Sequence, residues 1–408
     1  MNSKVLSYMT WICLLIILAN SVLYLDEVPL IRVFFSLFRL AAVAFAIVIA
    51  VKNKNFGGGY MKWLIAFFLT LGIITVLKRG ATNMVISNLL NSFGIALLLY
   101  NAIKESPKMA IRVFSSVFSF LIYLNFLTIL VAPGGIFDGS YLIGRNYNQI
   151  GMSLICGMVT NVVAYNMGVK HFTTVLILCI VCLMTTIITG SMTSAVGCLL
   201  TTGFLFIKKK ELKRIVLIVF FAFYVLFQSF VVFMQSDVSG MRAITYVIEN
   251  VMGKDLSFSD RARVWMIAYD FIQDSPVLGY GMQKNEWFEE TFLVKSAHNI
   301  IFQIMIYGGI VLLSCLVIVI IVSVHHAKKE KTALTYTIML GLCTAFFMMM
   351  MENYSMVLIL YMTCLLYNSN LLSQAVHTIA LEKKQKKLKN DNSHLLDHHS
   401  TLQYTATA

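Results

Sequence analysis

A series of long apolar runs constrains this sequence more than any other feature. Twelve such runs lie near 7–24, 30–51, 61–77, 84–103, 111–131, 148–168, 172–189, 192–207, 214–234, 298–323, 333–351 and 354–372. A run of about 20 apolar residues is long enough to cross a hydrocarbon core about 30 Å thick. Lipid offers no hydrogen-bond partners to the backbone, so an uninterrupted run must be helical there. The sequence therefore predicts an all-α polytopic membrane protein with about twelve transmembrane helices.

The composition agrees with this class. The chain is 59% hydrophobic and 12% charged, whereas a soluble domain carries about 25% charged residues. Its 408 residues would otherwise indicate two or three soluble domains. We instead predict four segments: nine transmembrane helices in 1–234, a loop domain in 235–297, three transmembrane helices in 298–372, and a basic tail in 373–408.

The distribution of Lys and Arg predicts the orientation. With a cytoplasmic N-terminus, 21 of the 32 Lys and Arg fall on the inner side, as the positive-inside rule requires. Both ends are then cytoplasmic and the loop 235–297 is external, although Lys78 and Arg79 fall on the external side against the rule. The net charge of +13 reflects this topology and gives no case for a nucleic-acid partner. The tail from Lys383 onward is interpreted as an inner-side anchor facing membrane lipid.

Several kinds of chemistry lack their motifs. All eight cysteines fall within predicted spans, so no disulfide framework is expected. The sequence has no P-loop, no HExxH and no acidic cluster with metal-ligand spacing. We therefore predict neither a metal nor another cofactor. Glu352, between the last two spans, is interpreted as an isolated carboxylate.

The loop 235–297 carries the pattern of an amphipathic helix. Residues 257–260 have the S-x-x-D form of a capping box. Apolar residues then recur at helical spacing, namely Val264, Ile267, Ala268, Phe271 and Ile272. Pro276 follows and predicts the end of the helix. Arg261 and Arg263 would lie in its first turn, where backbone amides and guanidinium groups together suit a phosphate-bearing ligand.

His298 stands where the tenth apolar run begins, followed by Asn299. In the predicted topology it is the only external histidine. An imidazole with an ordinary pKa near 6.5 can accept a proton at neutral pH, which suits a general base acting on a hydroxyl. The alternative is an interfacial side chain that caps a helix start. Arg261 has a comparable alternative, a surface ion pair with Asp260 or Asp274.

Two further arginines are candidates for ligand contact. Arg145 lies at the membrane edge in the glycine-rich external segment 132–147. Arg39 follows Arg32 by seven residues, so both lie on one helix face about 10.5 Å apart. Arg39 is the deeper of the two and should face a polar cavity or a partner. A structural ion pair is the alternative for Arg39.

The order and spacing of several residues resemble a known family. The pattern comprises Arg261-x-x-x-Trp265, then Asp274-Ser-Pro276-Val-Leu-Gly279-Tyr-Gly281, then His298-Asn299 with Gly309 eleven positions after the histidine. This stretch, about 260–312, resembles the O-antigen polymerase and O-antigen ligase family of bacterial polysaccharide enzymes. Two positions depart from the family pattern. Leu312 replaces the family's Gly, Thr or Tyr, and Ser191-Met192 replaces a common Ser-Arg.

The resemblance implies a membrane glycosyltransferase that uses undecaprenyl-diphosphate-linked glycans. It implies that Arg261 contacts the lipid diphosphate and that His298 assists the incoming hydroxyl, with Arg145 supplying the cation that Met192 cannot. The candidate site is then His298 as catalytic residue, with Arg261, Arg145, Arg263, Asn299 and Arg39 as substrate-binding residues. A flippase and a chain-length regulator of the same pathway are implied as partners.

These observations predict a polymerase of capsular, exopolysaccharide or O-antigen repeats in the bacterial plasma membrane, with an external active site. The first alternative is a ligase that transfers the finished glycan to lipid A core or to a protein. The second is a flippase or transporter of the lipid-linked sugar. Many transporters contain internal repeats, and none is visible in this sequence, which favours an enzyme.

Overall fold

The apolar runs fold into a bundle of helices in the computed structural model. The model describes residues 3–23, 28–136, 140–144, 147–233, 261–328, 332–378 and 381. Within these ranges there is no β-strand, and an isolated β-bridge joins Leu23 to Ile143. The all-α prediction is therefore confirmed.

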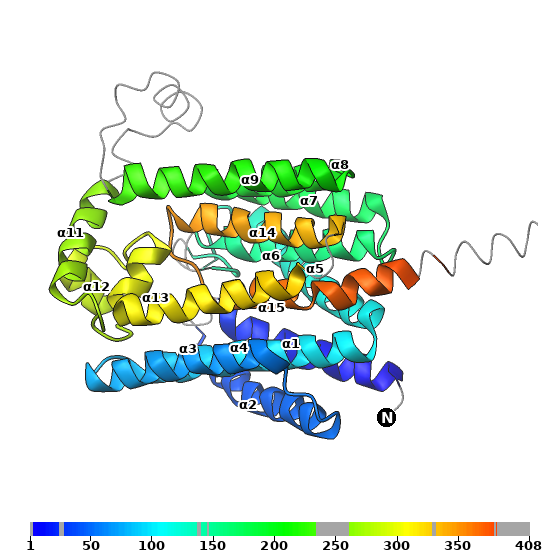
Figure 1. Cartoon of the computed structure of the whole chain (residues 1–408), viewed down its shortest axis with the longest axis horizontal. Coiled ribbons are helices and arrows are strands. Elements are labelled where there is room, and N and C mark those ends of the chain that lie inside the picture. Colours follow the sequence, from blue (N-terminus) through cyan, green and yellow to red (C-terminus); the bar gives the residue numbers. More distant parts are fainter. Residues whose placement is uncertain are drawn as a thin grey trace, which may run out of the picture.

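The helices follow the order of the apolar runs (Figure 1). The first five are α1 (Ser3–Val22), α2 (Pro29–Lys52), α3 (Gly58–Leu77), α4 (Thr82–Glu105) and α5 (Pro107–Val131). The next group is α6 (Ile150–Asn166), α7 (Phe172–Ile188), α8 (Met192–Phe206), α9 (Lys210–Phe227) and the π-helical turn η1 (Gln228–Phe233). The last group is α11 (Arg261–Asp274), α12 (Asn285–Phe292), α13 (Ile300–Ala327), α14 (Ala333–Met349) and α15 (Met356–Tyr367).

A helix stands at each of the twelve predicted positions, but their lengths differ. Among the described residues, seven helices are long and apolar enough to cross a membrane. An eighth span is formed if α15 is joined to the helix Ser369–Thr378, with a bend of 47° between them. The remaining four, α6, α7, α8 and α14, have 15 to 17 residues. At 1.5 Å per residue they reach about 25 Å, so for these four a full crossing remains a prediction.

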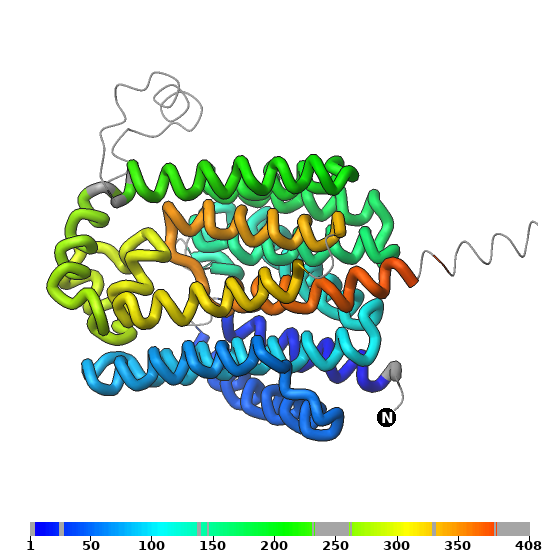
Figure 2. Tube along the Cα trace, viewed as in Figure 1, coloured from blue at the N-terminus to red at the C-terminus, as the bar shows by residue number. Residues whose placement is uncertain are grey.

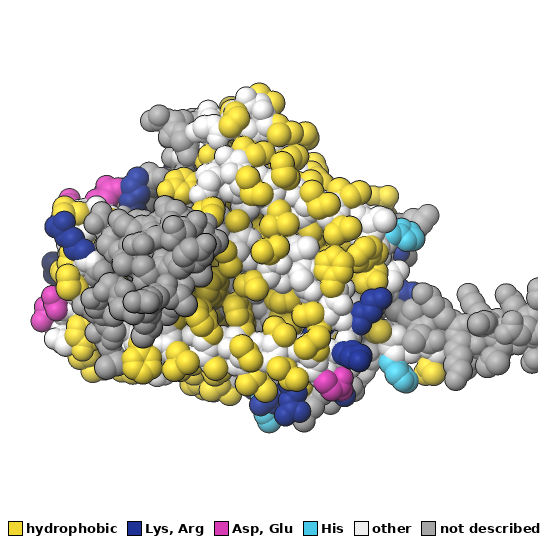
Figure 3. Space-filling view, turned by 90° about the horizontal axis from the view of Figure 1, so that it is seen from above, with side chains coloured by type: hydrophobic (Ala, Val, Ile, Leu, Met, Phe, Trp, Pro, Cys, Tyr) yellow, Lys and Arg dark blue, Asp and Glu magenta, His cyan; other side chains and the backbone are white. Residues whose placement is uncertain are grey.

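The surface has the arrangement expected of a membrane protein. On the face shown in Figure 3, apolar side chains cover the middle, whereas charged side chains lie mostly toward the two ends of the long axis. Helices α2 and α9 lie at the edge of the bundle with mostly exposed apolar side chains. Such exposure carries little cost against lipid tails, which are as apolar as leucine. Helix α15 is buried along its whole length and α6 along nearly all of it, so these two form the centre.

Helices α11 and α12 lie across one end of the bundle, beside the start of α13 (Figures 1 and 2). The predicted amphipathic helix is confirmed as α11, whose apolar face buries Val264, Ala268 and Ile272. The capping pattern at 257–260 lies outside the described residues. Helix α12 was not predicted from the sequence. We call this end of the bundle the His298 end.

A break in α13 receives the segment that follows α11. Gly308 and Gly309 have non-helical backbone angles, and Gly309 (φ 57°, ψ −159°) lies in a region that is essentially reserved for glycine. The break frees the Ile306 carbonyl, which accepts a hydrogen bond of 2.7 Å from the amide of Tyr280. Backbone groups freed inside a membrane protein must find such partners, so the break and the incoming segment require each other.

A second backbone contact closes the same joint. The amide of Ile310 donates to the Pro276 carbonyl over 2.9 Å. A Cβ atom added at Gly279 would lie 2.5 Å from the Ile306 oxygen, so this approach also requires glycine. The glycines of the motif therefore permit backbone to pack directly on backbone, which fixes α11 relative to α13.

The turn between α3 and α4 anchors the same segment from the other side. The amide of Met282 donates to Thr75 Oγ1 over 2.9 Å, and the amide of Ala81 donates to the Met282 carbonyl over 2.7 Å. Lys78 and Arg79 therefore lie at the His298 end. They are on the side that the predicted topology assigns to the loop.

Candidate functional site

His298 occupies a short connection between α12 and α13 and is held there by its neighbour. Its backbone is left-handed (φ 48°), a conformation that is uncommon for residues other than glycine. Asn299 is the N-cap of α13, and its Oδ1 accepts hydrogen bonds from the amides of Ile301 (3.0 Å) and Phe302 (3.2 Å). Satisfying these amides stabilises the helix start, and with it the position of His298.

The amide nitrogen of the Asn299 side chain connects this turn to two further elements. Its Nδ2 donates to the Met350 carbonyl at the end of α14 (3.2 Å) and to Oε1 of Gln228 in η1 (3.1 Å). The side chain is fully buried. Asn299 therefore joins three elements around His298 and acts as a positioning residue in this structure. Its predicted contact with substrate remains a prediction.

The imidazole of His298 pairs with a buried carboxylate. Nδ1 lies 3.0 Å from Oε1 of Glu352, which also accepts from the amide of Asn353 over 3.1 Å. The Glu352 side chain is 4% exposed and that of His298 is 23% exposed. An ionised carboxylate can only accept hydrogen bonds, so Nδ1 carries the proton. In a neutral imidazole that carries its proton on Nδ1, the lone pair is on Nε2.

Arg261 reaches the other oxygen of the same carboxylate. Its guanidinium nitrogen NH2 lies 3.7 Å from Glu352 Oε2, and its side chain is 15% exposed. Arg261 is the first residue of α11, and Trp265 one turn later is almost fully buried. The tryptophan packs the start of α11 into the bundle, which brings the arginine to the carboxylate. In the R-x-x-x-W pattern, Arg261 therefore supplies the cation, and the buried Trp265 fixes its position.

Glu352 corrects the interpretation drawn from the sequence. It was expected to be isolated between the last two spans, but it lies between His298 and Arg261. The sequence did contain a signal, because alternating spans place the connection before α15 on the same side as the loop before α13. A carboxylate in that connection is able to meet a histidine at the start of α13. We call His298, Glu352 and Arg261 the Glu352 cluster.

Tyr354 lies in the same connection and is 6% exposed. Burial, together with the negative charge of Glu352, raises the pKa of this phenol above its ordinary value, while Arg261 acts in the opposite direction. The hydroxyl therefore stays protonated at physiological pH. It adds a neutral hydrogen-bond donor beside the Glu352 cluster.

The remaining predicted residues lie elsewhere. Arg263 is exposed on α11. Arg39 donates to Ser87 Oγ over 2.6 Å, and its helix α2 packs on α1 and α4. The structure therefore does not bring Arg39 to His298, and its described contact is a hydroxyl. Its contact with a ligand remains a prediction. Arg145 lies outside the described residues.

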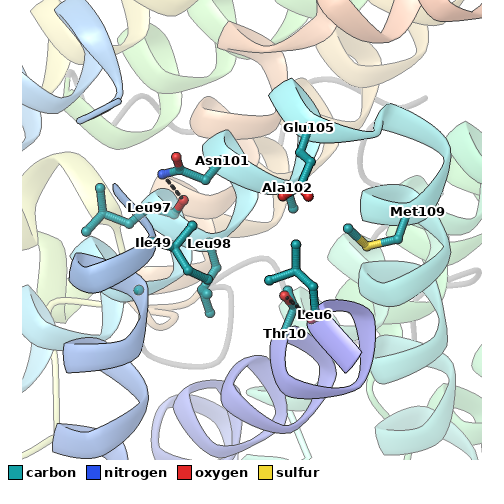
Figure 4. A pocket seen from close by; sticks show the side chains of 10 residues that line it. Leu6, Thr10, Ile49, Leu97, Leu98, Asn101, Ala102, Glu105 and Met109 are labelled. Atoms are coloured by element: carbon teal, nitrogen blue, oxygen red, sulfur yellow. Dashed lines mark hydrogen bonds between the residues drawn. The ribbon is translucent and has the colours of Figure 1, made fainter. Parts of the chain in front are cut away.

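A small cavity lies away from the Glu352 cluster. It lies between α1, α2 and α4, and Leu6, Ile49, Asn101 and Glu105 are among its lining residues (Figure 4). Its volume of about 10 Å³ has room for about one water molecule. Asn101 donates to the Leu97 carbonyl over 3.0 Å. This cavity cannot hold a sugar.

In the described part of the chain, no group of three or more His, Cys, Asp or Glu side chains is placed to hold a metal ion. The chemistry of the described groups is acid–base and electrostatic. The Glu352 cluster can accept a proton at Nε2, stabilise the resulting imidazolium through the carboxylate, and offer a guanidinium to an anion.

The comparison with protein families agrees with the motif analysis. A family model described as O-Antigen ligase matches residues 174–317. This segment runs from α7 into α13 and contains Arg261, His298 and Gly309. The resemblance predicted from these residues is therefore confirmed over that segment. No curated protein matches the chain. The family match supports a multi-pass membrane enzyme of polysaccharide assembly.

Proposed function

We propose that this protein is a membrane glycosyltransferase that polymerises oligosaccharide repeats carried on undecaprenyl diphosphate, with its site on the external face of the bacterial plasma membrane. The observation that carries the proposal is the Glu352 cluster, in which one buried carboxylate lies 3.0 Å from His298 Nδ1 and 3.7 Å from an Arg261 nitrogen. The cluster lies at an end of an apolar bundle, where a lipid-held donor can present its diphosphate (Figure 1).

The reaction follows from these groups. Nε2 of His298 accepts the proton of a sugar hydroxyl, and the oxygen attacks the anomeric carbon of the donor glycan. The bond from that carbon to the diphosphate oxygen breaks, and its electron pair leaves with the diphosphate. Glu352 stabilises the imidazolium that forms on His298, as the acidic member of a catalytic triad does. The donor supplies the free energy, so no nucleotide is consumed.

Arg261 suits the leaving group. A guanidinium offers paired donors in a rigid fork that matches phosphate oxygens, whereas an ammonium acts as a point charge. The nitrogen of Arg261 lies 3.7 Å from Glu352 Oε2, which is longer than a hydrogen bond between these groups. An anion that approaches the guanidinium more closely than this carboxylate would form the shorter, paired contacts that a phosphate allows.

The proposal is tested with purified protein in lipid nanodiscs and synthetic undecaprenyl-diphosphate-linked repeats, with product length read on gels. Wild-type protein should lengthen the glycan. His298→Ala should lower the rate at least about 100-fold, the lower range for loss of a general base. His298→Asn should be equally inactive while tolerating the left-handed backbone, which separates chemistry from folding. Undiminished elongation by both variants would show that His298 is not the general base, and the proposed site would be wrong.

The family description favours ligation as the second candidate. A ligase uses the same kind of donor but requires a different acceptor. The same nanodiscs should therefore be supplied with lipid A core oligosaccharide in place of the second repeat unit. Transfer to the core without elongation would assign ligation, whereas movement of the donor across the bilayer without any new bond would assign a flippase.

A further inference from the structure

A second, larger cavity lies at the end of the bundle opposite to the His298 end. It has a volume of about 480 Å³ and is lined by the ends of α6 and α8, the starts of α9 and α14, and Val376. Helix α9 runs from Lys210, beside the cavity, to η1 and α11 at the His298 end (Figure 1). Its 18 residues span about 27 Å. The cavity is therefore remote from the Glu352 cluster. We call it the Lys213 cavity.

Lys213 gives this cavity a buried cation. The residue is 3% exposed, and its Nζ donates to the Ala333 carbonyl (3.4 Å) and to the Thr337 hydroxyl. An ammonium group carries three N–H donors, so among the described residues one donor remains for a ligand. Lys170 differs, because its Nζ meets three acceptors and has no donor left.

Two more polar groups line the same cavity. Lys208 is exposed and adds a second positive charge. The Nδ2 atom of Asn166 is buried and has no hydrogen-bond partner within the described part of the chain. Among the described residues of the lining there is no acidic side chain. Two ammonium groups and an amide donor without carboxylates select an anion, and lysine is a common phosphate ligand.

The rest of the lining is apolar and continues onto the lipid-facing surface. Phe204, Leu205 and Ile207 contribute to the cavity wall. Beyond it, α9 exposes an apolar face that includes Ile215 and Ile218, each 57% exposed. A free inorganic anion would gain nothing from these surfaces, whereas an amphiphile would use both. Basic pockets between transmembrane helices are known to hold lipid headgroups.

We propose that the Lys213 cavity binds the phosphate headgroup of an anionic phospholipid, whose acyl chains lie along the exposed face of α9. The headgroup phosphate would accept from Lys213, Lys208 and Asn166. This lipid is neither donor nor acceptor in glycan transfer, and its site lies at the opposite end of the bundle. The proposal therefore stands independently of the proposed enzyme activity.

The experiment uses the full chain, purified in a zwitterionic detergent and titrated with dioleoylphosphatidylglycerol under native mass spectrometry. Dioleoylphosphatidylcholine and inorganic phosphate are titrated in parallel. Phosphatidylglycerol should bind at least about tenfold more tightly than phosphatidylcholine, the ratio expected from one hydrogen bond to a charged group. Equal binding of the two lipids, or saturation by inorganic phosphate that excludes the lipid, would overturn the proposal.

Two substitutions locate the site without disturbing a described hydrogen bond. Lys208→Gln removes an exposed charge, and Asn166→Leu removes an amide nitrogen that has no partner there. Each should weaken phosphatidylglycerol binding about tenfold. Lys52→Gln is the matched control, because Lys52 is an exposed lysine on α2 outside the cavity lining. An equal effect of Lys208→Gln and Lys52→Gln would show that general charge, and not this cavity, attracts the lipid.

Discussion

The Glu352 cluster and the surroundings of the half-buried Lys170 each hold a charge at an end of the bundle, but the two charges have different partners. Lys170 donates to Asn161 Oδ1 (2.6 Å), to Ser119 Oγ (2.9 Å) and to the Ser115 carbonyl (3.4 Å). These three neutral acceptors use all three of its donors. Glu352 instead faces a histidine and an arginine that are 23% and 15% exposed.

The difference separates a structural charge from a reactive one. A buried charge whose hydrogen-bonding capacity is exhausted can only hold its neighbours together. The Glu352 cluster differs, because in the described structure Nδ1 is the ring nitrogen of His298 that has a partner, and Nε2 keeps its capacity. The four predictions below test this contrast.

The largest expected effect is a loss of stability at Gly309, in the backbone contact between α13 and the segment after α11. This contact fixes the position of α11, and so of Arg261, in the Glu352 cluster. A Cβ added at Gly309 would lie 2.2 Å from the Val277 backbone, at φ 57°. Gly309→Ala should lower the free energy of unfolding by about 4 kcal/mol, the sum of backbone strain and steric overlap. Thermal unfolding in detergent measures it. Gly203→Ala, where a Cβ meets nothing within 4 Å, should change stability by less than about 1 kcal/mol. Equal effects of the two variants would show that the joint is not tight.

The second effect sharpens the assignment of Glu352. Glu352→Gln keeps the shape of the side chain but removes the charge that stabilises the imidazolium and fixes the ring. Glycan transfer should fall about 100-fold, within the range for acid–base catalysis, with little change in unfolding temperature. Glu289→Gln is the matched control, because Glu289 is an exposed carboxylate at the same end that pairs with Lys295 over 3.5 Å. A fully active Glu352→Gln enzyme would reduce Glu352 to a structural charge like Lys170.

The third effect distinguishes the two arginines of α11. Arg261→Lys preserves the charge but loses the paired donors, so the KM for the lipid-diphosphate donor should rise about tenfold. Arg263 is exposed, and Arg263→Lys should change the same KM by less than about twofold, since isolated surface charges contribute little. Steady-state kinetics with both variants measures this difference. A larger change from Arg263→Lys would place the diphosphate on the outer face of α11.

The sequence predicted the parts of the molecule that depend on local pattern. The apolar runs located the helices, and the spacing of Val264, Ala268 and Ile272 predicted the buried face of α11. His298 and Arg261 were also found, because the spacing of their motifs resembles a family. These inferences require no knowledge of which helices are neighbours.

What the sequence did not predict depends on contacts between distant segments. Glu352 lies 54 residues after His298 and outside the motif, so its pairing follows from the packing of α13 against α14 and α15. Arg39 shows the converse. Its depth in an apolar run predicted a polar partner, and the partner is Ser87 on the adjacent α4 rather than the site.

The smallest effect on activity is expected at Lys170, where the contrast predicts a change in stability alone. Burial lowers the pKa of Lys170 from 10.5 to about 8. Between pH 8 and 10.5 the unfolded chain therefore binds more protons than the folded one, and this residue makes the free energy of unfolding rise with pH. Lys170→Met should remove that rise, which unfolding temperatures at a series of pH values would show. Glycan transfer should stay within about twofold of wild type, because uncoupled distant sites act independently.

The control is Lys52→Gln, at an exposed lysine, which should leave the rise of stability with pH intact. Transfer that fails in Lys170→Met protein of normal stability would mean that the two ends of the bundle are coupled, and the distinction between a structural charge and a reactive one would no longer hold.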